Sequence, residues 1–435
     1  MRVLHVPYGY FPDAPGGTEQ YVAALAARQQ ARGDQVTIAA PAHSASEYVH
    51  NGLPVLRYPV TPELGLSDLW GAGDAQAAAE FGKLLERVQP ELVHLHAYTS
   101  GVSLRTAQEI RSRRIPLVFT YHSPSVTCAR GTLLRWGAQA CSGVLATEPC
   151  PSCTLASYGV PRAVAQVALP VVRVAAQLAL PRLGGLSTAA RTPALVEERN
   201  RCVLEFLRQP ARIMVPASWT GELLVKNGVN ADLVVLVRHG LDAVHSGDAS
   251  STRVVSEHPL RVAFFGRLDP AKGAHLLIEA LERETRLPVQ LVLFGIEQTG
   301  AHVLYAKALR QRAGQDKRIE LRRALPQHQV IAAMRDFDVV AVPSLVLETG
   351  PLVVLEAFAA HVPVLGTRLG GIAELVTDRQ NGLLLEPRPV AWHAALRELV
   401  QQPQLLAALR SGIRTPRTLD AVVEEVAGVY QAVVR

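Results

Sequence analysis

Two glutamates, Glu348 and Glu356, are separated by seven residues in a stretch that combines a predicted strand, a loop and a helix start. Residues 338–342 form the short apolar run of a buried strand, 344–350 lack periodicity, and 351–360 have a helical pattern that opens on a proline. Backbone N–H groups in the first turn of such a helix have no intrahelical partner and lie at the positive end of the helix dipole, so they suit a phosphate. Carboxylates on both sides of that turn can accept hydrogen bonds from the hydroxyls of a sugar and of a ribose. The stretch therefore predicts a site for a nucleotide sugar.

A second group of residues able to bind a diphosphate follows the predicted strand 260–265. Arg267 and Lys272 stand five positions apart in the loop 266–273. Arginine offers a bidentate fork to phosphate oxygens and lysine a point charge. Each feature has a plainer interpretation by itself, because single glutamates in helices and single loop cations are usually solvated. Their combination in one chain favours the binding interpretation.

The complete pattern around the glutamates resembles the signature of the retaining glycosyltransferases of family 4, which have the GT-B fold. The resemblance rests on Pro343-Ser344 before the first glutamate, and on Val362-Pro363-Val364 and Gly370-Gly371-Ile372 after the second. It implies two doubly wound, Rossmann-like α/β domains that face each other across a cleft. It also implies transfer of a sugar from a nucleotide-diphosphate donor to an acceptor hydroxyl with retention of configuration, in glycan or glycolipid biosynthesis.

The resemblance also assigns roles to individual residues. It implies that Arg267 and Lys272 bind the donor diphosphate, that Glu348 holds the donor sugar and that Glu356 holds the ribose. No residue stands out as a covalent nucleophile, which agrees with a front-face displacement, and no obligatory catalytic metal is implied. The catalytic residues expected on this basis are His122, Arg267, Lys272 and Glu348. The expected donor-binding residues are Gly16, Gly17, Gly266, Arg267, Lys272, Gly295, Glu348, Thr349, Gly350, Pro351, Leu352 and Glu356.

The first half of the chain alternates strand and helix patterns, which predicts βαβ units and a parallel sheet covered on both faces. Ligands of such sheets bind in the loops that follow the strands. One such loop, 8–17, ends in Gly16-Gly17 before a helix, where backbone can approach a ligand closely. Two later strand patterns end in His96 and His122. The resemblance places His122 beside the transferred sugar, and we expect His96 to lie behind it.

Four of the five cysteines lie within 26 positions after these histidines: Cys128, Cys141, Cys150 and Cys153. The last two have the spacing of a metal-ligating pair, and four thiolates could hold Zn²⁺ or an iron–sulfur cluster. The spacing of the first two is not that of a zinc finger or ribbon, and four unligated thiols in an ordinary loop are the plainer alternative. We expect a structural metal in a Cys-rich insertion at about 124–156 and a buried, unligated Cys202.

At 435 residues the chain is too long for one ordinary core, so two domains are expected. The acceptor-side domain is predicted at 1–242 and the nucleotide-sugar domain at 260–415, joined by a linker, 243–259, rich in Ser, Asp and His. By resemblance, residues 416–435 should form a helix that packs back on the first domain.

Composition limits the classes of partner. A formal charge of +6 and a pI of about 9.2 permit anionic ligands or an anionic membrane surface. Lys and Arg are not interleaved with aromatics in any run, which argues against nucleic acid. The N-terminal run is too short for a signal peptide, so a cytoplasmic location is expected. The apolar region 160–186 is too interrupted to span a bilayer, and it fits either two core helices or a helix on the inner membrane face.

The expected partners are a UDP-, GDP- or other nucleotide-sugar donor and a sugar, polysaccharide or lipid-linked acceptor. Two alternatives within enzymes are a nucleotide-sugar epimerase and a glycan phosphorylase on the same fold. The alternative outside enzymes is a non-catalytic scaffold that presents the Cys module to a partner.

Overall fold

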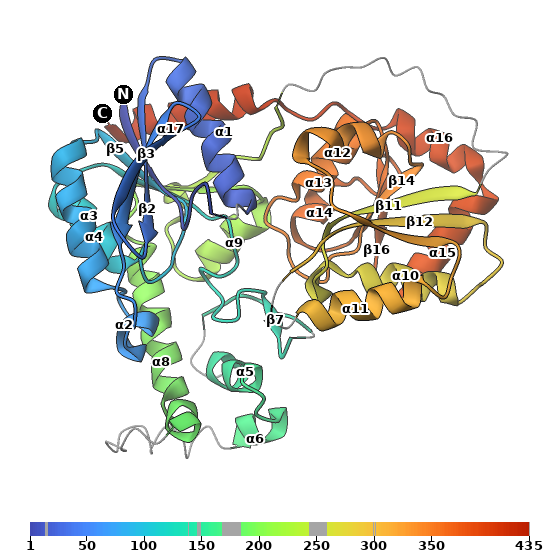
Figure 1. The fold of residues 1–435 in the computed structure, drawn as a ribbon, viewed down its shortest axis with the longest axis horizontal. Helices are drawn as coiled ribbons and strands as arrows, with labels where there is room; N and C mark the ends of the chain where they lie inside the picture. Colours follow the sequence, from blue (N-terminus) through green and yellow to red (C-terminus); the bar gives the residue numbers. More distant parts are fainter. Residues whose placement is uncertain are drawn as a thin grey trace. The chain divides into compact units, whose positions relative to one another are not determined.

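The computed structural model describes residues 1–13, 16–137, 139–145, 149–167, 184–242, 259–298, 300 and 302–434, without the side chains of 184–190. The chain forms two compact units (Figure 1): an N-terminal unit, Met1–Arg238 with Val422–Arg435, and a C-terminal unit, His239–Ala421. The expected linker, 243–259, lies outside the described residues except for Pro259, and so do residues 168–183 of the apolar region. Within the described part of the chain, no helix has the length and apolarity needed to cross a membrane.

The N-terminal unit is built on an eight-stranded sheet in the order β10-β9-β6-β5-β1-β2-β4-β3. Neighbouring strands are parallel except for the antiparallel pair β3 and β4. Its elements are β1 (Arg2–Val6), α1 (Gly17–Ala31), β2 (Gln35–Ala42), β3 (Ser46–His50), β4 (Leu53–Pro59), α2 (Leu66–Trp70), α3 (Ala75–Val88), β5 (Leu92–Leu95), α4 (Leu104–Ser112), β6 (Leu117–Thr120), β7 (Leu134–Arg135), β8 (Gln139–Ala140), α5 (Pro149–Ser157), α6 (Arg162–Val167), α8 (Gly184–Phe206), β9 (Arg212–Val215), α9 (Ser218–Lys226), η1 (Ala231–Leu233), β10 (Val234–Leu236) and α17 (Leu419–Val434).

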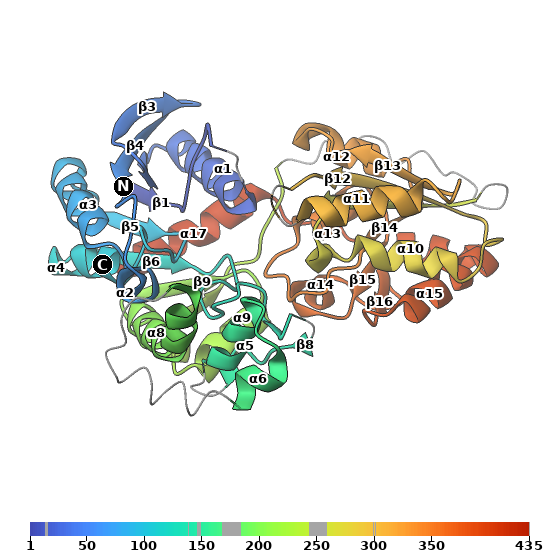
Figure 2. The same ribbon diagram turned by 60° about the horizontal axis from the view of Figure 1, so that its bottom comes forward.

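Helices cover both faces of this sheet, as Figure 2 shows. Side chains alternate along each strand, so Leu4 and Val6 of β1 enter a core with Phe81 of α3 and Phe206 of α8. On β2, Ile38 enters a second core that includes Val22 and Ala26 of α1. Burying one such side chain contributes roughly 1.5–3 kcal/mol. Burial on both faces explains why the strands read as nearly continuous apolar runs.

Helix α3 illustrates how local sequence sets an element's bounds. The Asp74 carboxylate caps it by accepting from the backbone N–H of Gln76 at 2.9 Å and of Ala77 at 3.1 Å. Phe81 faces the core, and the helix ends at Gln89 in the left-handed conformation with φ 48°. The cap at one end and the left-handed residue at the other explain why the helix begins at Ala75 and ends at Val88.

The C-terminal helix α17 belongs with the N-terminal unit from Val422 onward. Its Tyr430 is buried, and its hydroxyl lies 2.6 Å from Nδ1 of His94 in β5. Before this helix, Leu241 and Leu419 lie at the two chain crossings between the units, and Leu419 N donates to Leu241 O at 2.7 Å. Residues 239–242 and 416–421 group with the C-terminal unit, whereas the sequence analysis expected them with the N-terminal unit.

The C-terminal unit contains a six-stranded, fully parallel sheet in the order β13-β12-β11-β14-β15-β16. Its elements are β11 (Leu260–Arg267), η3 (Pro270–Lys272), α10 (Ala274–Glu282), β12 (Val289–Ile296), α11 (His302–Ala313), β13 (Ile319–Arg323), α12 (Gln327–Met334), β14 (Val339–Val342), α13 (Leu352–Ala359), β15 (Val364–Thr367), α14 (Gly370–Leu375), β16 (Gly382–Leu385), α15 (Pro389–Gln401) and α16 (Pro403–Ser411). One core packs α10, α11, α15 and α16 against the sheet around buried Trp392, and the other packs α12, α13 and α14.

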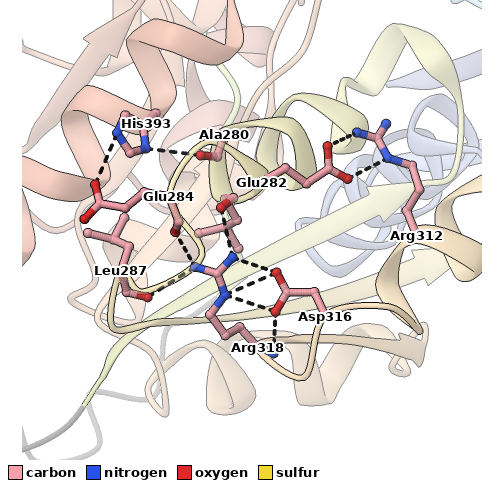
Figure 3. Close-up of polar contacts among 9 residues, drawn as sticks. Ala280, Glu282, Glu284, Leu287, Arg312, Asp316, Arg318 and His393 are labelled. Carbon is pink, nitrogen blue, oxygen red and sulfur yellow. Dashed lines mark hydrogen bonds and ion pairs between the residues drawn. The ribbon is translucent and has the colours of Figure 1, made fainter.

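Polar side chains tie the outer elements of this unit together (Figure 3). Arg318 pairs with Asp316 at 2.6 Å and donates to the carbonyl of Leu281, at the end of α10, at 2.9 Å. Arg312 of α11 pairs with Glu282 of α10 at 2.6 Å. These contacts join α10, α11 and the turn before β13.

Candidate functional site

Glu348 lies in the loop between β14 and α13, and its carboxylate is held from two directions. Lys272 Nζ donates to Glu348 Oε1 at 2.6 Å, and Ser344 Oγ donates to the same oxygen at 2.7 Å. The side chain of Glu348 is 15% exposed. Burial acts to raise the pKa of Glu348, but Lys272, Ser344 and the nearby charge of Arg267 outweigh burial and lower it. Glu348 is therefore an ionised carboxylate at neutral pH.

Arg267, the last residue of β11, is the more accessible of the two predicted cations. Its side chain is 51% exposed, against 26% for Lys272. One guanidinium nitrogen lies 3.6 Å from Asp269 Oδ2, and Asp269 Oδ1 accepts from Ala271 N at 2.8 Å in the following turn. The exposed guanidinium of Arg267 can make bidentate contacts, and the half-buried ammonium of Lys272 adds a point charge. Together they suit an anion such as a diphosphate.

Glycines bring the two loops together. Gly273 has φ +72°, and a Cβ there would lie 2.0 Å from the carbonyl oxygen of Pro343. A neighbouring backbone hydrogen bond, Leu345 N to Ala271 O at 2.8 Å, joins the same two loops. The turn that carries the lysine can approach the loop that carries the glutamate only because position 273 has no side chain.

A second glycine pair supports the backbone of Glu348. Gly371 N donates to Glu348 O at 2.7 Å, and Gly370 has φ +48°. A Cβ at Gly370 would lie 3.0 Å from both Glu348 N and Glu348 O. These two glycines, which entered the sequence analysis only as part of a signature, therefore position the glutamate loop.

Helix α13 begins at Leu352, one residue later than predicted. Pro351 has ψ 100°, an extended value, so it is the N-cap rather than the first helical residue. Further along this helix Glu356 is 6% exposed, and it accepts a hydrogen bond from Gln327 Nε2. Burial raises the pKa of Glu356, and the Gln327 hydrogen bond only partly offsets it. The two glutamates thus differ, one in an ion pair and the other beside a neutral amide.

The remaining expected donor-binding residues lie around the same loops. Gly266 and Gly295 are register partners in β11 and β12. A Cβ at Gly295 would lie 2.7 Å from the Leu268 side chain, so packing alone requires a glycine there. Thr349 and Gly350 are half-buried in the loop that precedes α13.

In the N-terminal unit, Gly16 is the N-cap of α1 and Gly17 is its first residue. The Gly16 N–H donates to Glu19 Oε2 at 2.8 Å, whereas a Cβ at Gly17 would meet nothing within 4 Å. One amide at this helix start is therefore already paired with a carboxylate. Any anion that approaches the other amides must be accommodated beside Glu19.

His122 begins a chain of hydrogen-bonded histidines that runs into the sheet. Its Nε2 lies 3.0 Å from Nδ1 of His96, and Nε2 of His96 lies 2.9 Å from Nδ1 of His5. The chain ends where His5 Nε2 lies 2.7 Å from Oε1 of Gln29, on α1. The structure thus places His96 behind His122, as predicted, and adds two members that the sequence analysis did not consider.

With Oε1 of the Gln29 amide oriented toward His5, as in the structure, the tautomer of every ring in the chain follows. A carbonyl oxygen only accepts, so His5 carries its proton on Nε2 and accepts at Nδ1 from His96. His96 in turn accepts at Nδ1 from Nε2–H of His122. Neutral His122 therefore carries its proton on Nε2 and its lone pair on Nδ1.

His5, His94 and His96 have nitrogens within 4.8 Å of one another, which is close enough for a metal site. Each ring nitrogen of the three nevertheless has a partner, since His94 contacts the Tyr430 hydroxyl at 2.6 Å and Thr120 Oγ1 at 2.7 Å. Burial lowers the pKa of all three, to about 4 for His5. Hydrogen bonding between neutral rings accounts for this cluster.

The clustered cysteines line one cavity of the N-terminal unit: Cys128, Cys141, Cys150 and Cys153. None of the five cysteines is in a disulfide. Cys202 is fully buried in α8, as predicted, and burial raises its pKa to about 11.

Comparison with solved structures defines the class of protein. The Anabaena protein HepE in complex with UDP has a TM-score of 0.68 and 17% identity, with 99% of this chain and 100% of that chain covered. Sucrose-phosphate synthase from Thermosynechococcus elongatus has a TM-score of 0.66 and 17% identity, with 99% of both chains covered. Two α/β units, each built on a sheet of mainly parallel strands, are those of the GT-B glycosyltransferase fold. The predicted fold class is therefore confirmed.

Sequence comparison then gives the family. The model "Glycosyltransferase Family 4" matches residues 15–173, and "Glycosyl transferases group 1" matches residues 251–415. The chain therefore belongs to the family 4 glycosyltransferases. The D-inositol 3-phosphate glycosyltransferase of Corynebacterium urealyticum is 33% identical over 147 residues, which are 32% of this chain and 34% of that protein. The protein of that name from Kribbella flavida is 33% identical over 181 residues, 38% of this chain and 42% of that protein. The chain thus matches about a third to two fifths of the length of these relatives.

Sequence reasoning missed His5, Gln29 and Ser344 as members of the candidate site. His5 and His94 are register partners in neighbouring strands; His5 is the fourth residue of β1, and His94 is the third residue of β5. A polar residue in the middle of a buried strand was the available signal. Gln29 had no such signal, because a glutamine on a helix is usually solvated.

Proposed function

We propose that this protein transfers a sugar from a nucleotide-diphosphate donor to an acceptor hydroxyl with retention of the anomeric configuration. The observation that carries the proposal is the ion pair between Lys272 and Glu348 at 2.6 Å, with the exposed fork of Arg267 beside it. Two cations and an ionised carboxylate, next to the start of α13, match the charges of a sugar diphosphate and the hydroxyls of its sugar.

In the proposed reaction the bond from the anomeric carbon to the diphosphate oxygen breaks while a bond to the acceptor oxygen forms on the same face. Arg267, Lys272 and the first-turn amides of α13 stabilise the negative charge that grows on the leaving diphosphate. The acceptor proton passes to a leaving phosphate oxygen, so no protein nucleophile is required. Glu348 accepts hydrogen bonds from the donor sugar and Glu356 from the ribose.

We infer a uridine diphosphate sugar as the first donor to test. HepE was solved in complexes with UDP, with UDP and glucose, and with UDP-glucose, and its fold covers 99% of this chain. The acceptor class stays a prediction: a sugar, a polysaccharide or a lipid-linked hydroxyl. Peripheral contact with the inner membrane face also stays a prediction. It rests on the apolar region 160–186, and residues 168–183 of that region lie outside the described residues.

Thermal stabilisation by nucleotides tests the donor half directly. At a ligand concentration 100 times Kd, binding to the folded state stabilises it by about 2.7 kcal/mol. UDP should therefore raise the melting temperature more than GDP or ADP, and Arg267→Ala and Lys272→Ala should each abolish most of that shift. Arg286→Ala, which removes an exposed arginine elsewhere in the same unit, is the matched control. Equal shifts in all three variants would contradict the proposed diphosphate site.

The alternatives predict different products. An epimerase would interconvert the donor sugar without any acceptor, and a phosphorylase would require inorganic phosphate. For the transferase, product analysis by NMR should show the donor's anomeric configuration in the new glycosidic bond. A scaffold without catalysis would retain its cellular function in Arg267→Ala, Lys272→Ala and Glu348→Ala.

A further inference from the structure

A cavity of about 260 Å³ in the N-terminal unit gathers the four clustered cysteines from three separate segments. Cys128 lies in the turns after β6, Cys141 follows β8 directly, and Cys150 and Cys153 are the second and fifth residues of α5. The cavity is lined by residues 127–130, 133–135, 141–145, 149, 150, 153, 154 and 200. Convergence of all four thiols on one space is not expected of unrelated cysteines in an ordinary loop.

Local hydrogen bonds hold each segment in place. Cys128 N donates to Pro124 O at 2.8 Å, and Cys141 N donates to Leu133 O at 2.8 Å at the base of the β7–β8 hairpin. Cys153 Sγ accepts the backbone N–H of Trp136, at the hairpin tip, at 3.2 Å. This contact joins the Cys153 sulfur to the tip of the β7–β8 hairpin, so that α5 and the hairpin are held together.

The guanidinium of Arg199, on α8, provides a second and independent observation. Its Nη2 donates to the carbonyl of Val126 at 3.1 Å, but its Nη1 is buried without a hydrogen-bond partner in the described structure. The thiols of Cys128 and Cys150 are among the ionisable groups that interact with it. The guanidinium also donates to the carbonyl of Ser125, but a buried positive charge with one unpaired nitrogen is stabilised further by an anion nearby. Neutral thiols do not supply one, whereas metal-bound thiolates do.

We propose that Cys128, Cys141, Cys150 and Cys153 form a tetrathiolate site for a thiophilic metal centre, either Zn²⁺ or an iron–sulfur cluster. Four thiolates around Zn²⁺ leave a net charge of −2, which Arg199 would neutralise in part. Since all four positions are protein ligands, the centre is structural and fastens the turn, the hairpin and α5 together.

Side-chain rotation must complete the site. In the structure no three of the sulfur atoms all lie within 4.8 Å of one another. Around Zn²⁺, with Zn–S of about 2.3 Å, the sulfur atoms are separated by about 3.8 Å. Metal binding would therefore require χ1 rotations that bring the sulfur atoms together, and the four cysteines are half-buried rather than fully buried.

Elemental analysis of protein purified under reducing, anaerobic conditions tests the proposal. We expect one zinc per chain, or stoichiometric iron with inorganic sulfide and visible absorbance, and these two results identify the centre. Single Cys→Ser changes at the four positions should each remove most of the metal, whereas Cys202→Ser, a fifth cysteine in the same unit, should leave it unchanged. Stoichiometric metal lost equally from Cys202→Ser, or no zinc and no iron in the unchanged protein, would overturn the site.

Two further measurements keep the test informative if a cysteine variant does not fold. In the unchanged protein, reaction with a thiol reagent should release the metal as the four thiols are modified. Co²⁺ exchanged into a zinc form should give the visible bands of tetrahedral thiolate coordination. Arg199→Met should weaken metal affinity by about 10–100-fold, the usual effect of losing a residue that supports the ligands. The site does not depend on the proposed transferase activity, so the result for one does not decide the other.

Discussion

The buried histidine cluster makes the N-terminal unit sensitive to mild acid. His5 is fully buried, and burial lowers its pKa from 6.5 to about 4. Such a group binds a proton more readily in the unfolded chain, so its contribution to stability is complete above the unfolded pKa and is lost as the pH falls from 6.5 toward 4. The pKa values of His94 and His96 are lowered in the same direction, which adds to the effect.

The size of the loss follows from these pKa values. Between pH 7.5 and pH 5.0, a shift from 6.5 to about 4 removes about 2 kcal/mol of unfolding free energy through His5 alone. Carboxylates with lowered pKa, such as Asp74, act with the same sign, but their loss begins as the pH falls through the usual carboxyl pKa, which for Asp is 3.8 and lies beneath this window. The loss between pH 7.5 and 5.0 therefore reports on the histidines.

Hydrogen exchange, followed by mass spectrometry on peptides that contain β1 and β5, measures this free energy within the unit. We expect protection to fall as the pH is lowered, after correction for the intrinsic exchange rate. His5→Gln should reduce the slope of stability with pH, whereas His328→Gln, an exposed histidine of α12, should not change it. Protection that stays constant between pH 7.5 and 5.0, or an unchanged slope in His5→Gln, would refute burial as the cause.

Three other predictions concern single contacts. Glu348→Gln should remove the ion-pair partner of Lys272. It should weaken turnover more than UDP binding, because the proposed role of Glu348 is to hold the donor sugar. An equal loss of UDP affinity, measured by calorimetry, would contradict that role. Gly273→Ala should lower unfolding free energy by about 2 kcal/mol or more, because the left-handed φ costs roughly 1–2 kcal/mol and a Cβ would also meet Pro343 O at 2.0 Å. Gly300→Ala has a similar φ of +67° and no contact within 4 Å, so urea unfolding should show a smaller loss there, and equal losses would exclude the steric term. Gln29→Ala should allow His122 to populate both neutral tautomers. In ¹⁵N NMR of the imidazole, a mixed signal should replace the signal of protonation at Nε2 alone. An unchanged signal would show that Gln29 does not orient the hydrogen-bonded histidines.

Features encoded by neighbouring residues were predictable from sequence. The alternation of strands and helices in the first half of the chain was predicted, and α3 and β5 are examples, because capping and apolar periodicity act within a few residues. The Glu348 loop and the family resemblance were likewise readable, since the diphosphate-binding pattern is local in each loop. The shift of the helix start from Pro351 to Leu352 reflects one backbone angle, ψ of Pro351, which residue type alone does not specify.

The contacts that make these residues a site depended on the order of the strands. Lys272 meets Glu348 across 76 positions because β11 and β14 are neighbours, and Gly273 permits the approach. His5 meets His96 across 91 positions because β1 lies beside β5, and that pairing buries the rings and directs their protons. Residue types and local spacing thus specified which chemical groups were available. Strand order, which depends on long-range burial and not on local pattern, decided which of them are in contact.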